Sequence, residues 1–462
     1  MIVDRYQPIN LCELIPALRL EMDADLAALD RLLEDDVLLQ RVKADLAGRY
    51  PNTPNLGRHS TPVEVILRML IVRRLYDWSY EETERFVSDS LMLRQFCRLY
   101  LNPAPDDSTL IRWAALVEPQ TLEKVNERVV ALARGLKVTR GRKLRVDGTV
   151  VETTIRYPGD SNLLGDGVRV LSRLIGRAKR VVAHRVQGGA RVFRNRTRSA
   201  KRLARQIAEA ARRRGEAGEG ARRAIYRRLL GVTEASLRQA RLVRQGLMAC
   251  NDKMARGLAR ELDRFLPLVE QAVSQTYRRV VLGEAVPAAE KVVSLFEPHT
   301  CIIRRGKAEK PTEFGRKVWL DEVDGGIVSG YRVLAGNPPD REQLAASLAQ
   351  HRRLFGRAPD TLAGDRGVHS AQNELLARQM GVKWVALPKP GYKSPERRGY
   401  ERQGWFRRAQ RFRAGAEGRI SVLKRRGYLG RCRDHGEGGF GRWVGWGVIT
   451  ANLATIVRKT AA

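Results

Sequence analysis

Cysteine and histidine, the residues that build disulfide frameworks and most zinc sites, are sparse in this sequence. The five cysteines are spread along the chain with no close pair: Cys12, Cys97, Cys250, Cys301 and Cys432. This spacing argues against a disulfide framework and a zinc ribbon, so we expect reduced cysteines that fill space rather than react. The six histidines are equally dispersed, and a histidine-based metal site is therefore not expected.

Long uncharged hydrophobic runs are also missing. The most apolar segment near the start, residues 63–76, carries four charged side chains: Glu64, Arg68, Arg73 and Arg74. Charges at this density exclude a helix that crosses a bilayer. Residues 1–20 lack the layout of a signal peptide. We therefore expect a cytoplasmic protein with no membrane partner.

Acidic residues are outnumbered by basic ones. The 462 residues include 85 Lys and Arg against 51 Asp and Glu, which gives a formal net charge of +34. Arginine dominates, and its planar guanidinium matches the geometry of phosphate. This charge indicates a polyanionic partner. The apolar fraction of 43% excludes a disordered polycation and is ordinary for a globular chain of about two to four domains.

The chain has a helical pattern up to about residue 140. Residues 1–58 include an acidic amphipathic segment at 22–47, which is typical of a docking or dimerising helix. Residues 59–140 are expected to form several short helices, some with Ser or Thr caps, and resemble a DNA-binding domain of the helix-turn-helix type. An ordinary small helical bundle explains them equally well, because no feature of the sequence identifies a recognition helix.

Strand patterns begin near residue 142. Alternating apolar residues predict a strand at 142–154, with Asp147 in its middle third. Later segments predict a hairpin that turns at 324–326, followed by a helix, a strand that ends near Asp365, a helix and a last strand. This order predicts an α/β domain formed by 141–160 and 295–462, with a mixed sheet and flanking helices.

Residues 161–294 interrupt that domain as a basic helical insertion. Between Arg169 and Arg228 there are 20 Lys and Arg against three Glu, so this stretch holds half of the net charge. A solvated helical surface is the usual explanation of such a run. Because these charges repel one another unless phosphate neutralises them, we favour contact with DNA.

Three acidic residues are candidates for catalysis. Asp365 follows a predicted buried strand at a glycine-rich turn, which is where the sites of open α/β sheets form. Asp147 lies on a strand that could neighbour it in the sheet. Glu417 lies on a late helix, on one stripe with Arg413 and Lys424. Taken alone, this helix is better explained as a solvated ladder of ion pairs.

Several stretches resemble the catalytic motifs of bacterial insertion-sequence transposases of the DDE class. They are VDGTVVET, LAGDRGVHS, and RAGAEGRISVLKRR with the GRWVGWGVITANLATI that comes after it. The resemblance covers about 59–160 and 295–462, and it implies a ribonuclease-H-like catalytic domain. The insertion is similar to helical insertions of some branches of this family, mainly in its position and charge.

The resemblance also implies roles for individual residues. It assigns catalysis and metal binding to three acids, Asp147, Asp365 and Glu417. It assigns DNA binding to Arg413 and Lys424, which match the family's arginine four residues before the glutamate and lysine seven residues after it. The family has a tyrosine three residues before that arginine, where this chain has Gln410.

The activity that the resemblance implies is DNA transposition. Two Mg²⁺ ions, with Mn²⁺ as a substitute, would activate water to nick the terminal inverted repeats and then direct the freed 3′-OH onto target DNA. The expected partner is double-stranded DNA, both the repeats and the target. We expect a homodimer on DNA, since two ends must be held together, in the nucleoid of a bacterial cytoplasm.

Two other functions stay open. One is a nuclease or resolvase on the same fold, which cuts DNA without strand transfer. The other is a non-catalytic, basic nucleic-acid-binding protein, such as a degenerate transposase. Glu152 and Asp321 are rival acids in strand-like segments, and we interpret both as solvated positions at strand edges.

Overall fold

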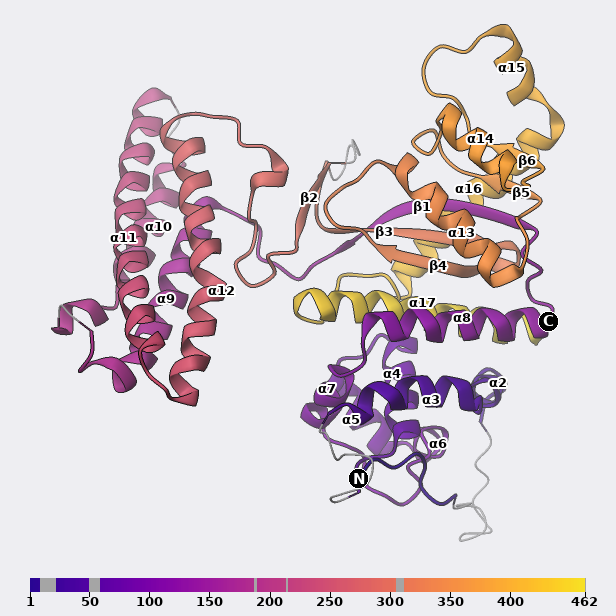
Figure 1. Ribbon diagram of the computed structural model, residues 1–462, viewed down its shortest axis with the longest axis horizontal. Helices are drawn as coiled ribbons and strands as arrows, with labels where there is room; N and C mark the ends of the chain where they lie inside the picture. The colour runs from indigo at the N-terminus through magenta and orange to yellow at the C-terminus, as the bar shows by residue number, and fades with distance from the viewer. Residues whose placement is uncertain (9–21, 50–58, 187–188, 213–214, 305–310, 462) are drawn as a thin grey trace. The chain divides into compact units, whose positions relative to one another are not determined.

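The computed structural model describes residues 1–8, 22–49, 59–186, 189–212, 215–304 and 311–461 (Figure 1). Within them the chain forms two compact units. The α/β unit comprises Met1–Thr153 and Arg316–Ala462, and the helical unit comprises Thr154–Gly315. Cys12 lies outside the described residues. The other four cysteines are free: Cys97, Cys250, Cys301 and Cys432.

The described residues of the α/β unit begin with a helical region. Its helices are α2 (Ala24–Leu33), α3 (Asp36–Ala47), α4 (Val63–Leu75), α5 (Tyr80–Asp89), α6 (Leu91–Phe96), α7 (Asp107–Ala114) and α8 (Pro119–Gly135). Side chains of Asp or Ser cap most of them. Ser79 and Glu82 form a complete capping box at the start of α5, which satisfies backbone donors that a helix start leaves unpaired. The helical pattern predicted for this part of the chain is confirmed.

Helix α4 is buried almost along its whole length, including its charged residues. Arg68 lies in the core, where it donates to Glu64 at 3.0 Å and to Asp30 at 2.5 Å. It also donates to the carbonyl oxygen of Phe96 at 3.1 Å. These partners compensate for the loss of water around the guanidinium. No helix in the described parts of the chain has both the length and the apolarity needed to cross a membrane.

The sheet is mixed and open, as predicted. Its strands are β1 (Lys143–Glu152), β2 (Cys301–Arg304), β3 (Thr312–Val323), β4 (Ile327–Val333), β5 (Thr361–Ala363) and β6 (Trp384–Ala386). The order is β2-β3-β1-β5-β6, with β4 also paired to β3. β3 and β4 form the predicted antiparallel hairpin around Asp324–Gly326. β1, β5 and β6 run parallel, so their carboxyl ends meet at one edge.

Helices α8 and α17 (Gly436–Thr460) join the helical region to the sheet. Figure 1 shows both between the N-terminal helices and the strands, and both contact β4. Two buried asparagines fix this contact. Asn452 of α17 accepts from the amide of Val328 and donates to its carbonyl, both at 2.8 Å. Asn126 of α8 accepts from Asn452 at 2.8 Å and donates to the same carbonyl at 3.1 Å. The main hydrophobic core of the α/β unit therefore extends from the N-terminal helices to the sheet, and two smaller clusters lie beside it.

The remaining helices of this unit follow the sheet strands. They are α13 (Leu344–Phe355), α14 (Ala371–Gln379), α15 (Pro395–Arg402), α16 (Gly404–Arg425) and α17 (Gly436–Thr460). Gly356 ends α13 in the left-handed conformation, with φ of 72°, and Ser370 caps α14. The predicted alternation of strands and helices after the hairpin is confirmed.

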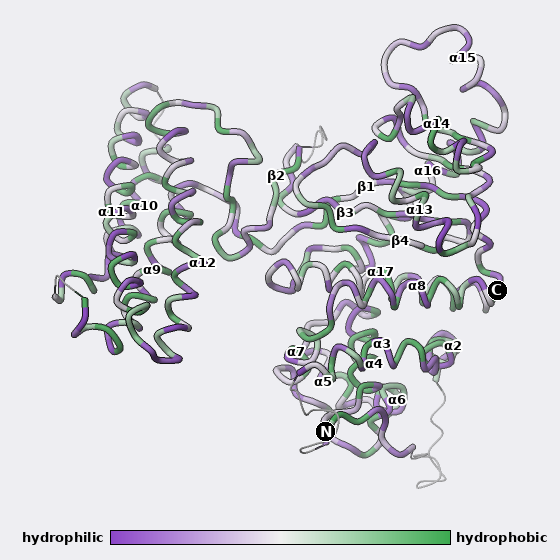
Figure 2. The backbone as a smooth tube through the Cα atoms, in the orientation of Figure 1, coloured by the Kyte–Doolittle hydropathy of each residue, from purple (hydrophilic) through white to green (hydrophobic). Residues whose placement is uncertain are grey.

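The helical unit contains the insertion predicted at 161–294. Its α-helices are α9 (Asp160–Val182), α10 (Thr197–Ala210), α11 (Glu216–Met248) and α12 (Lys253–Thr276). Hydrophobic and hydrophilic residues alternate along them (Figure 2), and the hydrophobic ones form a core separate from that of the α/β unit. Most of the basic side chains of α10 and α11 are exposed.

The buried imidazole of His351 on α13 predicts a pH dependence of stability. Burial lowers its pKa to about 4, whereas an imidazole in the unfolded chain has a pKa near 6.5. Between these values the unfolded chain binds more protons, so stability falls as the pH drops from about 6.5 to 4, by about 3 kcal/mol at most. His351→Phe should lack this component in urea unfolding measured at pH 7 and pH 4.5. The exposed His59 provides the control His59→Phe, and an equal pH dependence of both variants would contradict the prediction.

Candidate active site

Asp147 and Asp365 lie on neighbouring strands at the same edge of the sheet. Residues 143–145 of β1 pair in parallel with residues 361–363 of β5. Continued by two residues, this register sets Asp147 opposite Asp365. Asp365 follows the end of β5, as predicted, and its Oδ1 accepts from the amide of Val368 at 3.1 Å. The two carboxylates therefore belong to one region of the surface, where β1 continues and β5 gives way to a turn.

Arg145 connects β1 to both β3 and helix α16. Arg145 of β1 donates to both carboxylate oxygens of Glu322, at 2.9 and 2.6 Å. Its Nη1 also donates to the carbonyl of Phe412 at 2.5 Å. A Cβ at position 415 would lie 2.5 Å from this Nη1, so glycine at that position permits the close approach. The next residue after Phe412 is Arg413, which is thereby held at the level of Asp147.

Arg413 joins two of the three candidate acids. Its Nη1 donates to Oε1 of Glu417 at 2.9 Å, and its Nη2 donates to Oδ2 of Asp147 at 3.3 Å. The Asp147 side chain is 14% exposed and that of Glu417 is 70% exposed. The ion pair predicted within α16 therefore exists, but it also extends to the sheet. Lys424 lies two turns further along the same helix and is partly buried.

Gln410, which stands where the resemblance implies a tyrosine, has a structural contact. Its Nε2 donates to the carbonyl of Ala386 at 2.7 Å and to that of Gly364 at 3.3 Å. These carbonyls lie at the ends of β6 and β5, next to Asp365. The side chain thus attaches α16 to the edge of the sheet that carries the acids.

Sequence reasoning missed a fourth acid at this edge. Asp340 forms an ion pair with Lys317 of β3 at 2.5 Å. Its Oδ1 lies 3.5 Å from where a Cβ of Gly148 would be, and its Oδ2 lies 3.3 Å from the equivalent point at Gly367. Oδ1 of Asp365 is also 3.3 Å from that point at Gly367. The only signal in the sequence is an aspartate directly after two prolines, which by itself indicates a turn.

The interpretation of Asp321 as a solvated strand-edge residue was wrong. Asp321 is 1% exposed, and it accepts from Trp319 Nε1 at 3.0 Å and from Arg332 Nη1 at 3.1 Å. Burial raises the pKa of its carboxyl. Both donors belong to the β3–β4 hairpin, so the Asp321 carboxylate is bound within that hairpin. Glu152, at the end of β1, is partly exposed and pairs with Arg431 at 3.0 Å.

The chemistry of the three predicted acids fits a hard divalent cation. All three offer carboxylate oxygens, the ligands that Mg²⁺ prefers in proteins. The guanidinium of Arg413 between Asp147 and Glu417 indicates that this position favours positive charge. In the side-chain arrangement of the described residues, however, no three His, Cys, Asp or Glu side chains are grouped so that they could hold a metal ion.

Comparison with known protein families shows a match to part of the N-terminal helical region. Residues 17–116 match the family described as Transposase domain (DUF772). The matched range includes α2 to α7 and ends before β1, so it lies outside the candidate acids. It supports a transposase family and, with it, a function in transposition. No curated protein and no solved structure matches the chain.

Proposed function

We propose that the protein is a DNA transposase of the DDE class with a ribonuclease-H-like catalytic domain. It would cut DNA strands at the terminal inverted repeats of an element and transfer the freed 3′-OH into target DNA. The transposase-domain match supports the general function. The observation that carries the catalytic assignment is the link from Asp147 on β1 through Arg413 to Glu417 on α16, at the sheet edge where Asp365 lies.

The proposed metal ligands are Asp147, Asp365 and Glu417. Mg²⁺ ions bound there would supply Lewis-acid stabilisation of the scissile phosphate and lower the pKa of an attacking water. The protein's own contribution is to hold these carboxylates on rigid elements. Oδ1 of Asp147 accepts from the amide of Gly148 at 2.8 Å, and the central strand fixes the backbone on either side.

Arg413 and Lys424 are the proposed DNA ligands at this site. Arginine binds phosphate through two parallel hydrogen bonds, so a DNA phosphate can replace the carboxylates that Arg413 now contacts. Lys424 adds a second cation about three turns beyond Arg413 on α16. Both contacts would be to the backbone of the duplex, so they position DNA rather than read its sequence. The helical region at 59–140 is the proposed DNA-binding domain, acting in a homodimer that holds two ends.

A nucleic-acid-binding protein without catalysis is the second candidate. It is favoured by the state of Glu417, whose exposed carboxylate is paired within its own helix as in an ordinary surface ion pair. In this case the basic charge alone would account for the interaction with DNA.

Removal of the metal distinguishes the proposed transposase from a DNA-binding protein without catalysis. The full chain, incubated with Mg²⁺ and a labelled duplex that carries the element's ends, is expected to give nicked and then joined products on a denaturing gel. EDTA should abolish both products while DNA binding, measured by fluorescence anisotropy, persists. Added Mn²⁺ should restore them, because both ions accept carboxylate ligands. Nicks without joined products would identify a nuclease, and binding without nicks in either metal would identify the non-catalytic protein.

A further inference from the structure

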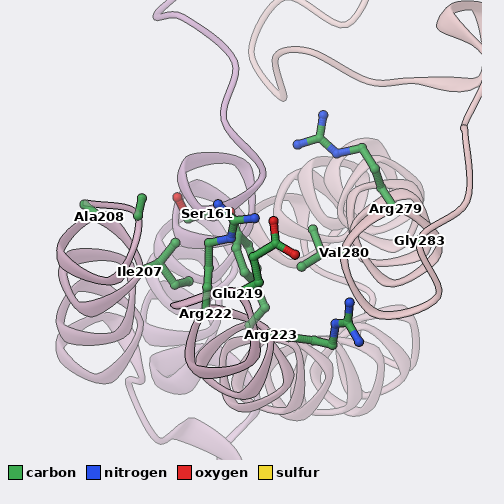
Figure 3. Close-up of a pocket in the computed structure, with 11 residues that line it drawn as sticks. Ser161, Ile207, Ala208, Glu219, Arg222, Arg223, Arg279, Val280 and Gly283 are labelled. Atoms are coloured by element: carbon green, nitrogen blue, oxygen red, sulfur yellow. The ribbon is translucent and has the colours of Figure 1, made fainter. Parts of the chain in front are cut away.

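The helical unit contains a cavity that the proposed catalytic site does not use. Its volume is about 650 Å³, within the usual range for pockets that bind small organic molecules. Its walls come from the start of α9, the end of α10, the first turns of α11 and the π-helical segment Tyr277–Val281 after α12 (Figure 3). All of these segments belong to the helical unit.

Two arginines of α11 give the cavity unpaired positive charge. Arg222 and Arg223 both line it, and neither guanidinium has an ion-pair or hydrogen-bond partner among the described residues. A third, Arg279, pairs with the buried carboxylate of Asp160. Guanidinium groups without a carboxylate partner raise the positive potential of a concave site, which favours an anion there. Arginine's fork of donors favours phosphate among such anions.

The segment that carries Arg279 has an unusual backbone. Residues Tyr277–Val281 form a π-helix, and both Arg279 and Val280 line the cavity. π-Helical turns are rare and occur frequently at functional sites. The π-helical turn therefore indicates a functional site at this cavity, and it does so independently of the charge of the cavity.

The other groups around the cavity select among phosphate compounds. The cavity has apolar walls at Ile207 and Ala208 of α10 on one side and at Val280 on the other, while Glu219 of α11 adds one carboxylate between them (Figure 3). The arginines would attract a free phosphate ion, but Glu219 would repel it and offer it no hydrogen bond. A nucleotide has a phosphate for the arginines, a flat apolar base for the walls, and, in adenine and cytosine, an amino group that can donate to a carboxylate.

We propose that this cavity binds a nucleotide, with its phosphate on Arg222 and Arg223 and its base between the apolar walls at Ile207 and Val280. The nucleotide can belong to a DNA strand or be a free mononucleotide. The first source rests on the proposed function as a DNA transposase, whereas the second does not.

The test compares two double variants of the full chain that remove the same charge from the same helix. Arg222→Gln with Arg223→Gln alters the cavity. Arg227→Gln with Arg228→Gln is the control, because these exposed residues lie one turn further on and do not line it. Binding of a labelled ten-nucleotide single strand is measured by fluorescence anisotropy in EDTA. The cavity variant should bind roughly tenfold more weakly than the control, since it lacks two charge-assisted contacts.

A third variant tests the cavity without changing its charge. Ala208→Trp places a large side chain in the space, so it should weaken binding as much as the loss of both arginines. Equal affinities of the two double variants, or full binding by Ala208→Trp, would overturn the proposal and leave only general attraction between charges. Competition by dAMP identifies a free nucleotide as the source, and loss of strand binding without such competition identifies DNA. Because no metal is present, these results do not depend on whether the protein cuts DNA.

Discussion

Asp147→Asn is expected to lose strand cleavage by on the order of 10³-fold while it binds DNA with unchanged affinity. Asparagine keeps the size of the side chain and can still accept from the amide of Gly148. It lacks the negative charge that Arg413 contacts and that a divalent cation requires. A loss of several kcal/mol of transition-state stabilisation corresponds to about this factor in rate. The rate is measured in single-turnover nicking of a labelled element end, and the affinity by fluorescence anisotropy.

Asp360→Asn is the matched control. Asp360 comes directly before β5, at the opposite end of the strand from Asp365, and its exposed carboxylate pairs with Arg357 at 3.2 Å. This variant should nick DNA within about twofold of the wild-type rate, since surface ion pairs contribute little. Wild-type nicking by Asp147→Asn would remove Asp147 from the catalytic site. Equal losses in both variants would point to a general effect on the fold.

Arg68→Met should lower the free energy of unfolding by about 3–5 kcal/mol, the range for breaking a buried ion pair by removing one partner. Methionine fills part of the space, but Glu64 and the partly buried Asp30 then lose the one fully buried guanidinium that contacts both. Arg98 contacts both acids from a more exposed position and is retained. Urea unfolding followed by circular dichroism measures the change. Glu64→Leu, added to Arg68→Met, should recover part of the loss because it removes one of the carboxylates that Arg68 neutralised.

An exposed arginine of the same helical region serves for comparison. Arg112 of α7 forms side-chain hydrogen bonds only within its own helix, so Arg112→Met is expected to change stability by about 0.5 kcal/mol or less. If Arg68→Met unfolded at the same urea concentration as Arg112→Met, the buried network would not stabilise the fold as its geometry implies.

Local patterns in the sequence predicted the elements of the sheet well. The strand predicted at 142–154, the Asp324-Gly325-Gly326 turn and the helix predicted after Asp365 each depend on a few residues, and the structure has all of them. The burial of β1 does not alternate, however, because both of its faces are covered. The position of Asp365 after β5 was predictable for the same reason. Such patterns are governed by backbone geometry and by which face of an element is buried.

Contacts between distant parts of the chain were not predictable in this way. The link from Arg413 to Asp147 joins residues that are 266 positions apart, and it depends on how α16 lies on β1. Asp340 approaches Gly148 and Gly367 only because its loop folds back onto the sheet. The burial of Asp321 depends on the donors of Trp319 and Arg332. A single sequence does not show how distant segments align with one another in the fold. The side-chain partners of Asp147, Asp340 and Asp321 were therefore not predicted.

The burial of α17 between the N-terminal helices and β4 affects how the polypeptide can mature on the ribosome. α17 packs on α2, α4 and α8, and these helices are synthesised hundreds of residues before it. Until Gly436–Thr460 emerges, the apolar surfaces that it covers stay exposed to water or to chaperones. The N-terminal helices thus share their hydrophobic core with the last helix of the unit. A chain that ends before Gly436 would leave this part of their apolar surface uncovered, which is a route to aggregation during synthesis.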